Sequence, residues 1–217
     1  MLSLNNKIMK DKNFIHYEPR LSDEEMIEID GNPRFYRRNE IVLFNSYKKD
    51  DTGIMSNFYS NCGIKYDGRE FHSSEQLLFY RNIMKWGEGF VGKDDIINII
   101  MDCKCGRDVK NNYKVKKFRK KVEEKKREVL GLKGAYLESW KNLYFCIKKK
   151  YEYCREFRDV LEKYKDKIYV EDSFWGDNFA GCMYENGWYK GVNACGRVMR
   201  AVYNEGVAGR GNRLGED

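Results

Sequence analysis

Histidine and proline are scarce in this chain, which has two of each among 217 residues. Both prolines lie within residues 1–40, and no apolar run approaches the roughly 20 residues that a membrane-spanning helix needs. We therefore expect a soluble protein. A tetrahedral zinc site would have to use cysteines, of which only Cys103 and Cys105 lie close together. Neither His16 nor His72 supplies further ligands at a workable spacing, so we expect no metal site and no cofactor.

The seven cysteines are odd in number and lack the spacing of a disulfide framework. Together with the absence of a recognisable signal peptide, this predicts a reducing, cytoplasmic setting. Lys and Arg number 41 against 34 Asp and Glu, which gives a net charge of +7. This moderate basic excess favours an anionic ligand and allows nucleic acid as a partner.

The pattern along the chain predicts one domain with an extension at each end. Residues 1–40 are polar, with one short helix expected after Ser22, and we interpret them as an N-terminal extension. Residues 41–204 carry the periodic segments and form the expected domain. Residues 205–217 are rich in glycine and are expected to be a flexible C-terminal tail.

Hydrophobic periodicity predicts a mainly α-helical α+β fold with a few short strands. The first strand is expected at residues 40–44, and a hairpin is expected to turn at residues 66–68. A helix over residues 74–86 is the strongest prediction, because Ser73 and Gln76 have capping-box spacing and apolar residues follow at helical intervals. Further helices are expected over residues 93–103 and 110–130, and one helix or a pair of helices over residues 136–164. Residues 190–205 are expected to form a glycine-rich loop that enters a short helix. The charge of residues 110–130 is typical of a solvated helix face.

Glu75 allows two interpretations. It falls in the first turn of its predicted helix, where the helix dipole favours a negative charge, and many acidic residues lie there for that reason alone. A carboxylate held ionised at that position could also activate a water or stabilise a developing sugar cation. Spacing does not decide between the two interpretations.

Asp172 and Trp175 also allow two interpretations. A tryptophan face beside a carboxylate suits a nucleobase and a ribose, and Gly176 would let the backbone approach a ligand. A core tryptophan with an exposed loop acid explains the same residues. The choice stays open on spacing alone.

Five motifs taken in this order resemble the NADAR family, also known as YbiA-like domains. They are S-N-F at residues 56–58, S-S-E-Q at 73–76, G-R at 106–107, D-x-x-W-G at 172–176 and G-x-N-x-x-G-x-x-M at 191–199. The resemblance covers residues 44–203. It implies a compact, mainly helical α+β domain that hydrolyses N-glycosidic bonds and needs no cofactor.

The resemblance also implies roles for individual residues. Glu75 and Asp172 would be the acidic catalytic residues, and Arg107 would face a phosphate, which its planar fork suits. The remaining substrate-binding residues would be Asn57, Phe58, Ser74, Trp175, Gly176, Gly191 and Asn193. The family's lysine, considered able to form an imine with the opened ribose, is replaced here by Cys103, so that Lys104 is the candidate for that role. On a helical segment this displacement would turn the side chain by about 100°, which favours direct attack by water.

Three functional hypotheses follow. The first is removal of ADP-ribose from guanine in nucleic acid, with an ADP-ribosylating toxin as an associated partner, and the lysine-rich residues 110–133 favour this polymeric substrate. The second is cleavage of ribosylamino-pyrimidine phosphates of riboflavin synthesis. The third is a non-catalytic module that binds ADP-ribose or NAD, to which the displaced lysine points.

Overall fold

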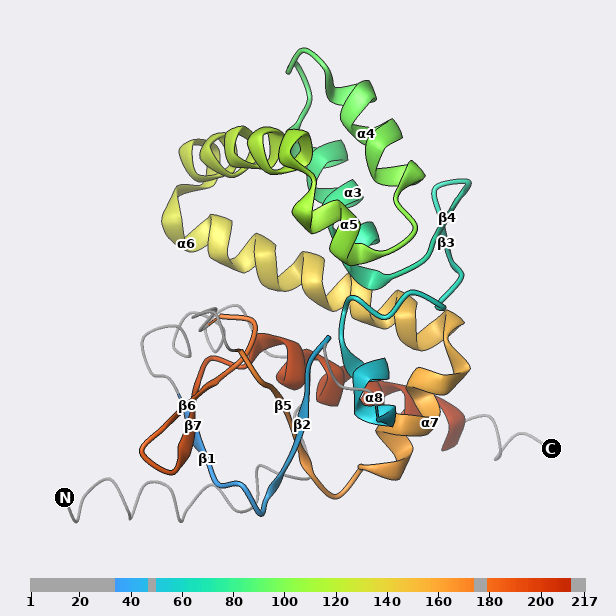
Figure 1. Ribbon diagram of the computed structural model, residues 1–217, viewed down its shortest axis with the longest axis vertical. Helices are drawn as coiled ribbons and strands as arrows, with labels where there is room; N and C mark the ends of the chain where they lie inside the picture. The colour runs from blue at the N-terminus through green and yellow to red at the C-terminus, as the bar shows by residue number, and fades with distance from the viewer. Residues whose placement is uncertain (1–33, 47–49, 174–178, 212–217) are drawn as a thin grey trace. The chain divides into compact units, whose positions relative to one another are not determined.

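The computed structural model describes residues 34–46, 50–173 and 179–211 (Figure 1). It is a mixed structure of α-helices and a few short strands, in which helices predominate. The chain divides into two compact units, residues 1–52 with 158–217 and residues 53–157, and each is described on its own. The helix expected after Ser22 lies outside the described residues.

Unit 1 is built on two small sheets. Strand β2 (Ile41–Phe44) pairs in parallel with β5 (Ile168–Glu171), which confirms the strand expected at residues 40–44. In the other sheet, β7 (Trp188–Gly191) lies between β1 (Arg34–Tyr36) and β6 (Met183–Glu185), antiparallel to both. The side chains of both sheets share one buried core of Tyr36, Ile41, Leu43, Val170, Cys182 and Tyr189.

Both ends of unit 1 contain more regular structure than the sequence predicts. Strand β1 falls within residues 1–40 and pairs with β7 over its whole length. At the other end, helix α8 (Ala194–Gly211) buries Val198, Met199 and Val202, as expected, and then continues to Gly211. The structure therefore differs from the predicted flexible tail over residues 205–211. Helix formation is cooperative, so an anchored first part can carry a glycine-rich end.

The two strands of unit 2, β3 (Ile64–Tyr66) and β4 (Arg69–Phe71), form a hairpin that follows the short 3-10 helix η2 (Asp51–Met55). Its two turn residues, Asp67 and Gly68, have φ angles of 53° and 67°. Positive φ at both positions is the requirement of a type I′ turn, which Asp-Gly satisfies well. The predicted hairpin is confirmed.

Helices make up most of unit 2. Helix α3 (Ser74–Trp86) has the predicted bounds, and Gly87 is its C-cap. It packs against α4 (Lys93–Asp102), α5 (Gly106–Asn111) and the long α6 (Tyr113–Tyr153). Helix α7 (Arg155–Lys163) begins in unit 2, and its residues from Arg158 onward belong to unit 1.

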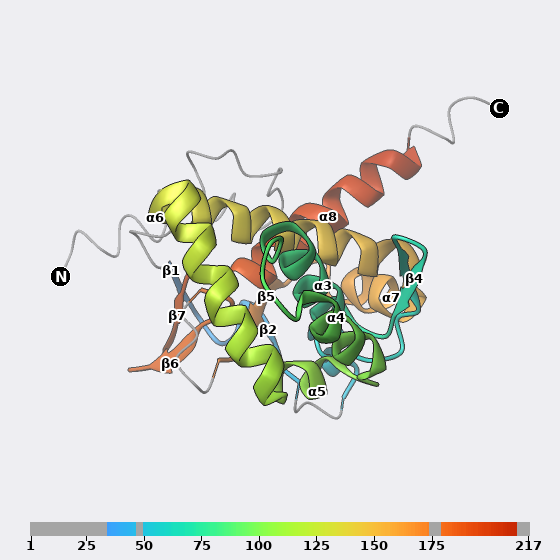
Figure 2. The same ribbon diagram turned by 90° about the horizontal axis from the view of Figure 1, so that it is seen from above.

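Helix α6 consists of two straight parts. Gly131 interrupts it with φ 69° and ψ 175°, which are not helical values. Figure 2 shows the two parts running in different directions from this bend. Glycine tolerates such a conformation because it has no Cβ.

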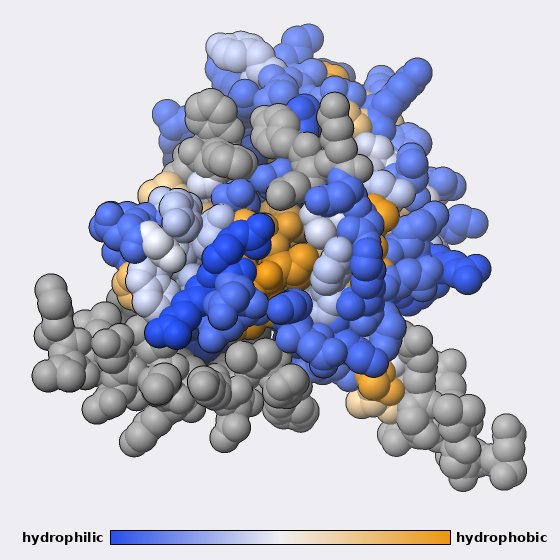
Figure 3. Space-filling view, turned by 60° about the horizontal axis from the view of Figure 1, so that its bottom comes forward, coloured by the Kyte–Doolittle hydropathy of each residue, from blue (hydrophilic) through white to orange (hydrophobic). Residues whose placement is uncertain are grey.

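Charged side chains lie mainly outside. In the space-filling view of Figure 3, hydrophilic side chains cover most of the visible face, and hydrophobic ones gather near its centre. Within the described ranges, no helix has both the length and the apolar character required to cross a bilayer.

Candidate functional site

The start of α3 is held by side chains on both of its sides. Ser73 is the N-cap, and its hydroxyl accepts a hydrogen bond from the Gln76 amide at 3.2 Å. The Gln76 side chain accepts from the amide of His72 at 2.8 Å rather than from Ser73, so the capping box is shifted by one residue. Its Nε2 donates to the Ile100 oxygen at 2.7 Å and so ties α3 to the end of α4.

Asn57, Ser74 and Glu75 form a buried polar group that we call the α3 cluster. The Ser74 hydroxyl donates to Asn57 Oδ1 at 3.0 Å, and the Glu75 amide donates to the Asn57 main-chain oxygen at 3.0 Å. The three residues are between 1% and 8% exposed. Two predicted site motifs that lie 17 residues apart are therefore joined by direct contacts. A nearly buried glutamate needs a reason, since carboxylates are rarely buried unless they are paired or hydrogen-bonded.

The first residue of α5 lies against this cluster. A Cβ placed on Gly106 would come within 2.7 Å of the Glu75 Cβ and 2.8 Å of the Ser73 hydroxyl. Only glycine allows this approach. The G-R motif thus has a packing reason for its glycine, and Arg107 follows it, half-buried, in the first turn of α5.

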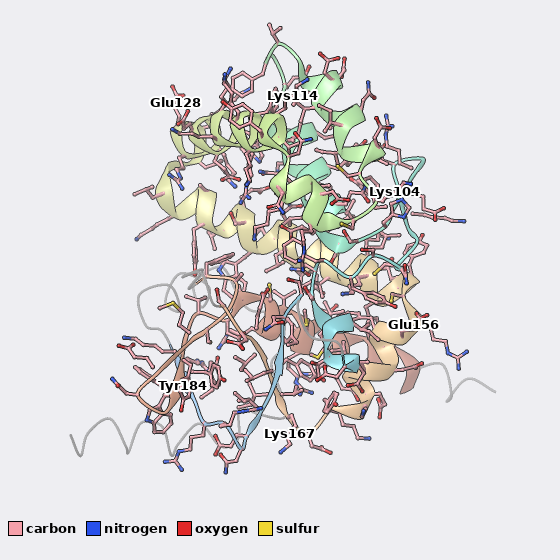
Figure 4. All side chains as sticks on the ribbon, viewed as in Figure 1. Lys104, Lys114, Glu128, Glu156, Lys167 and Tyr184 are labelled. Carbon is pink, nitrogen blue, oxygen red and sulfur yellow. The ribbon has the colours of Figure 1, made fainter. Side chains whose placement is uncertain are left out.

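Lys104 lies in a bend between α4 and α5 and is exposed (Figure 4). The expectation that it lies on a helical segment is wrong. The reason is that α4 ends at Asp102, where Gln76 binds the oxygens of Ile100 and Cys103. The 100° rotation argument therefore does not apply, and the direction of Lys104 depends on the bend.

Phe58 follows the α3 cluster directly and is half-buried. Its amide donates to the Ser56 hydroxyl at 3.3 Å. The ammonium of Lys110, on α5, lies 5.0 Å from the centre of the Phe58 ring. An aromatic face with a cation beside it suits a flat, electron-rich or anionic group.

Lys150 is a residue that the sequence analysis missed. It is fully buried on α6, and its ammonium donates to the main-chain oxygens of Ile54 and Ser56, each at 2.6 Å. The Phe157 ring lies 4.4 Å from it. Lys150 thus fixes the turn that leads into Asn57. Its helical phase, three residues after buried Ile147 and four before buried Cys154, is the signal that could have revealed it.

Two buried thiols lie near this lysine. The side chains of Cys62 and Cys154 share a hydrogen bond, which lowers the pKa of Cys154 and raises that of Cys62. The positive charge of Lys150 lowers the pKa of both thiols. Glu156 opposes it, and its carboxylate accepts from the Cys154 thiol at 3.6 Å.

The remaining predicted site residues belong to unit 1. Asp172 follows β5, with its amide donating to the Phe44 oxygen at 2.9 Å. It is half-buried, and its charge adds to burial in raising the pKa of Tyr189. Trp175 and Gly176 lie outside the described residues.

Asn193 and Gly191 have visible structural tasks. Asn193 is fully buried, and its Nδ2 donates to the Tyr169 oxygen at 2.7 Å while its Oδ1 accepts from the Glu171 amide at 3.2 Å. It therefore completes β5 as a strand neighbour would. A Cβ on Gly191 would lie 2.2 Å from the Gly181 oxygen, so its glycine permits strand packing. Their predicted contact with a ligand remains a prediction.

The arrangement suggests a carboxylate-based site in unit 2. Among the described residues, no group of three or more His, Cys, Asp and Glu side chains is arranged to hold a metal ion. Comparison of the sequence with models of known protein families gives no match, and a search of curated proteins gives none either.

Proposed function

We propose that this protein is an N-glycosidase that removes ADP-ribose from guanine in nucleic acid. The observation that carries the proposal is the α3 cluster. In it, the Glu75 amide and the Ser74 hydroxyl both donate hydrogen bonds to Asn57, which holds Glu75 in place. The motif resemblance, which joins these same residues, supports it. The net charge of +7 suits a substrate that carries a pyrophosphate and a phosphate backbone.

The reaction requires little more than a carboxylate and an oriented substrate. The bond between ribose C1′ and the base nitrogen breaks, and positive charge develops on the sugar. Water then attacks C1′ and gives up a proton, and the leaving guanine nitrogen takes up a proton from the solvent. Glu75 would stabilise the cation or accept the proton of the water. Asp172 is the second acidic residue of the proposal.

The substrate contacts follow from the surroundings of Glu75. Asn57 and Ser74 would bind ribose hydroxyls, and Phe58 with Lys110 beside it would take a flat group. Arg107 would bind a phosphate. The motif resemblance assigns Trp175, Gly176, Gly191 and Asn193 to substrate binding as well.

Lys104 separates two routes. The imine route needs an amine held beside the opened ribose, and Lys104 is an exposed side chain in the bend between α4 and α5. We therefore favour direct attack by water. Borohydride added during turnover would trap a covalent adduct on Lys104 if the imine forms, and full hydrolysis without an adduct would support the direct route.

The decisive experiment is a substrate panel with products identified by mass spectrometry. The protein is incubated with ADP-ribosylated guanosine, with ADP-ribosylated DNA and with the ribosylamino-pyrimidine phosphate of riboflavin synthesis. We expect ADP-ribose and guanosine from the first, and ADP-ribose and unmodified DNA from the second. Cleavage of the pyrimidine alone would indicate the small-molecule activity instead. Calorimetric binding of ADP-ribose or NAD with no cleavage would indicate a non-catalytic module and contradict the proposal.

A further inference from the structure

The first part of α6 presents six basic side chains on one exposed face. We call them the α6 basic face: Lys114, Lys116, Lys117, Lys120, Lys121 and Arg127, all exposed. At about 100° per residue, they fall within an arc of roughly 160°. Figure 4 labels Lys114 and Glu128 on this part of the helix. Only Glu124 and Glu128 add negative charge to the face, so its balance is clearly positive.

These cations are not neutralised within the described part of the chain. None of the six has an ion-pair partner there, whereas other lysines do. Lys85 pairs with Glu138 at 2.7 Å, Lys149 with Glu152 at 2.6 Å and Lys165 with Glu162 at 2.9 Å. Like charges three and four residues apart on a helix repel each other. A bound polyanion would remove that repulsion.

The opposite side of the same helix is already occupied. Val115, Phe118 and Val122 are at most 7% exposed. A helix that lies in a membrane surface must insert an apolar face between lipids, and this helix has its apolar face buried in its own unit. Apart from Tyr113, which is exposed at its start, the α6 basic face offers charge rather than apolar anchors, which favours a nucleic acid over a bilayer.

We propose that the α6 basic face binds the phosphate backbone of a nucleic acid. Lys114 and Arg127 lie 13 positions apart, which is roughly 20 Å along the helix axis at 1.5 Å per residue. One strand carries a phosphate about every 3.4 Å, so that this length matches about six phosphates. The inference extends the proposed function by giving its polymeric substrate a contact surface. Backbone binding needs no base contacts, so it should be independent of sequence.

The test is fluorescence anisotropy with an unmodified, labelled single-stranded oligonucleotide of about 20 nucleotides, between about 50 and 200 mM salt. The variant replaces Lys116, Lys117 and Lys120 by Gln. Gln keeps the helix propensity close to that of Lys, and the side chains are exposed, so the fold should persist. The matched control replaces the paired Lys85, Lys149 and Lys165 by Gln and removes the same net charge.

We expect the face variant to bind about tenfold or more weakly at low salt, with the slope of log K against log salt reduced by about two. The control should stay near the wild type. Equal loss in both variants would show a mere net-charge effect and overturn the proposal, as would an unchanged face variant. Binding to phosphatidylserine vesicles in preference to the oligonucleotide would also overturn it.

The result is separate from catalysis. The oligonucleotide carries no ADP-ribose, so its binding can succeed even if the substrate panel shows no cleavage. Calorimetry with free ADP-ribose tests whether the substituted lysines contact the small ligand. We expect the face variant to bind ADP-ribose as the wild type does. Loss of ADP-ribose binding in the face variant would place these lysines in the ligand pocket and contradict their assignment to a backbone.

Discussion

Asparagines of two predicted site motifs behave differently in the two units. Asn57 in unit 2 binds another side chain, the Ser74 hydroxyl, and its main chain receives the amide of Glu75. Asn193 in unit 1 binds only main-chain groups in its observed contacts, the Tyr169 oxygen and the Glu171 amide. The first holds the surroundings of a carboxylate, and the second holds a strand. A motif residue can therefore be required by the fold rather than by a ligand.

The largest expected effect concerns Glu75. Gln has almost the shape of Glu but lacks the charge that would stabilise a sugar cation. We expect Glu75→Gln to lower kcat by about a hundredfold or more while leaving the unfolding transition in place. Product release from ADP-ribosylated guanosine measures it.

Glu70→Gln is the matched control, since Glu70 is an exposed acid on β4. It should keep wild-type turnover. If Glu75→Gln also kept it, Glu75 would be only a favourable charge at the start of α3, and the proposed site in unit 2 would have to be abandoned.

Lys150 tests whether the α3 cluster depends on the turn before it. Lys150→Met keeps the length of the side chain but leaves the oxygens of Ile54 and Ser56 without their buried donor. We expect a loss of about 3 kcal/mol in the free energy of unfolding, measured with urea. Lys149→Met, at the half-buried neighbouring position, should change it by no more than about 0.5 kcal/mol.

Asn193 and Asn57 can be compared directly. Asn193→Ala removes two hydrogen bonds and places alanine at a φ of 56°, so we expect a loss of about 3 kcal/mol in the free energy of unfolding. Asn57→Ala should cost about 1 kcal/mol, because the Ser74 hydroxyl already lies 3.3 Å from the Asn57 main-chain oxygen and can turn to it.

A further variant separates the two causes at position 193. Asn193→Gly also lacks the two side-chain hydrogen bonds, but glycine adopts a positive φ without strain. Its free energy of unfolding should therefore fall between those of the wild type and Asn193→Ala. Equal losses of stability for Asn57→Ala and Asn193→Ala would contradict the conclusion that the two asparagines have different roles. A loss of turnover at position 57 alone would sharpen it.

Local signals predicted the local parts of this fold. The bounds of α3 followed from a capping serine, helical spacing and Gly87, and the β3–β4 hairpin followed from Asp67 and Gly68. The contact between the S-N-F and S-S-E-Q motifs was expected only from the resemblance. The signals for α3 and for the hairpin lie within a few residues of the element that they specify.

What escaped prediction depends on distant partners. Strand β1 has three residues and gains its structure from β7, which is more than 150 positions away. The helical phase of Lys150 indicates that it is buried, but no local pattern indicates that it binds residues 54–56 or that Asn193 binds β5. The structural role of a buried polar residue depends on which backbone group without a backbone partner lies next to it in the tertiary fold.

The smallest expected effect concerns Cys154, which lies in the surroundings of Lys150. Its pKa is lowered in the folded state, first by the hydrogen bond from Cys62 and also by the charge of Lys150. The ionised thiol thus stabilises the fold, and the free energy of unfolding should rise as the pH increases from the folded pKa toward the ordinary thiol value of about 8.5. Thiolate absorbance near neutral pH, lost in Cys154→Ser and reduced in Cys62→Ser, measures the ionisation. If both variants titrate like the wild type, the two thiols do not share a proton and the surroundings of Lys150 are less polar than their contacts indicate.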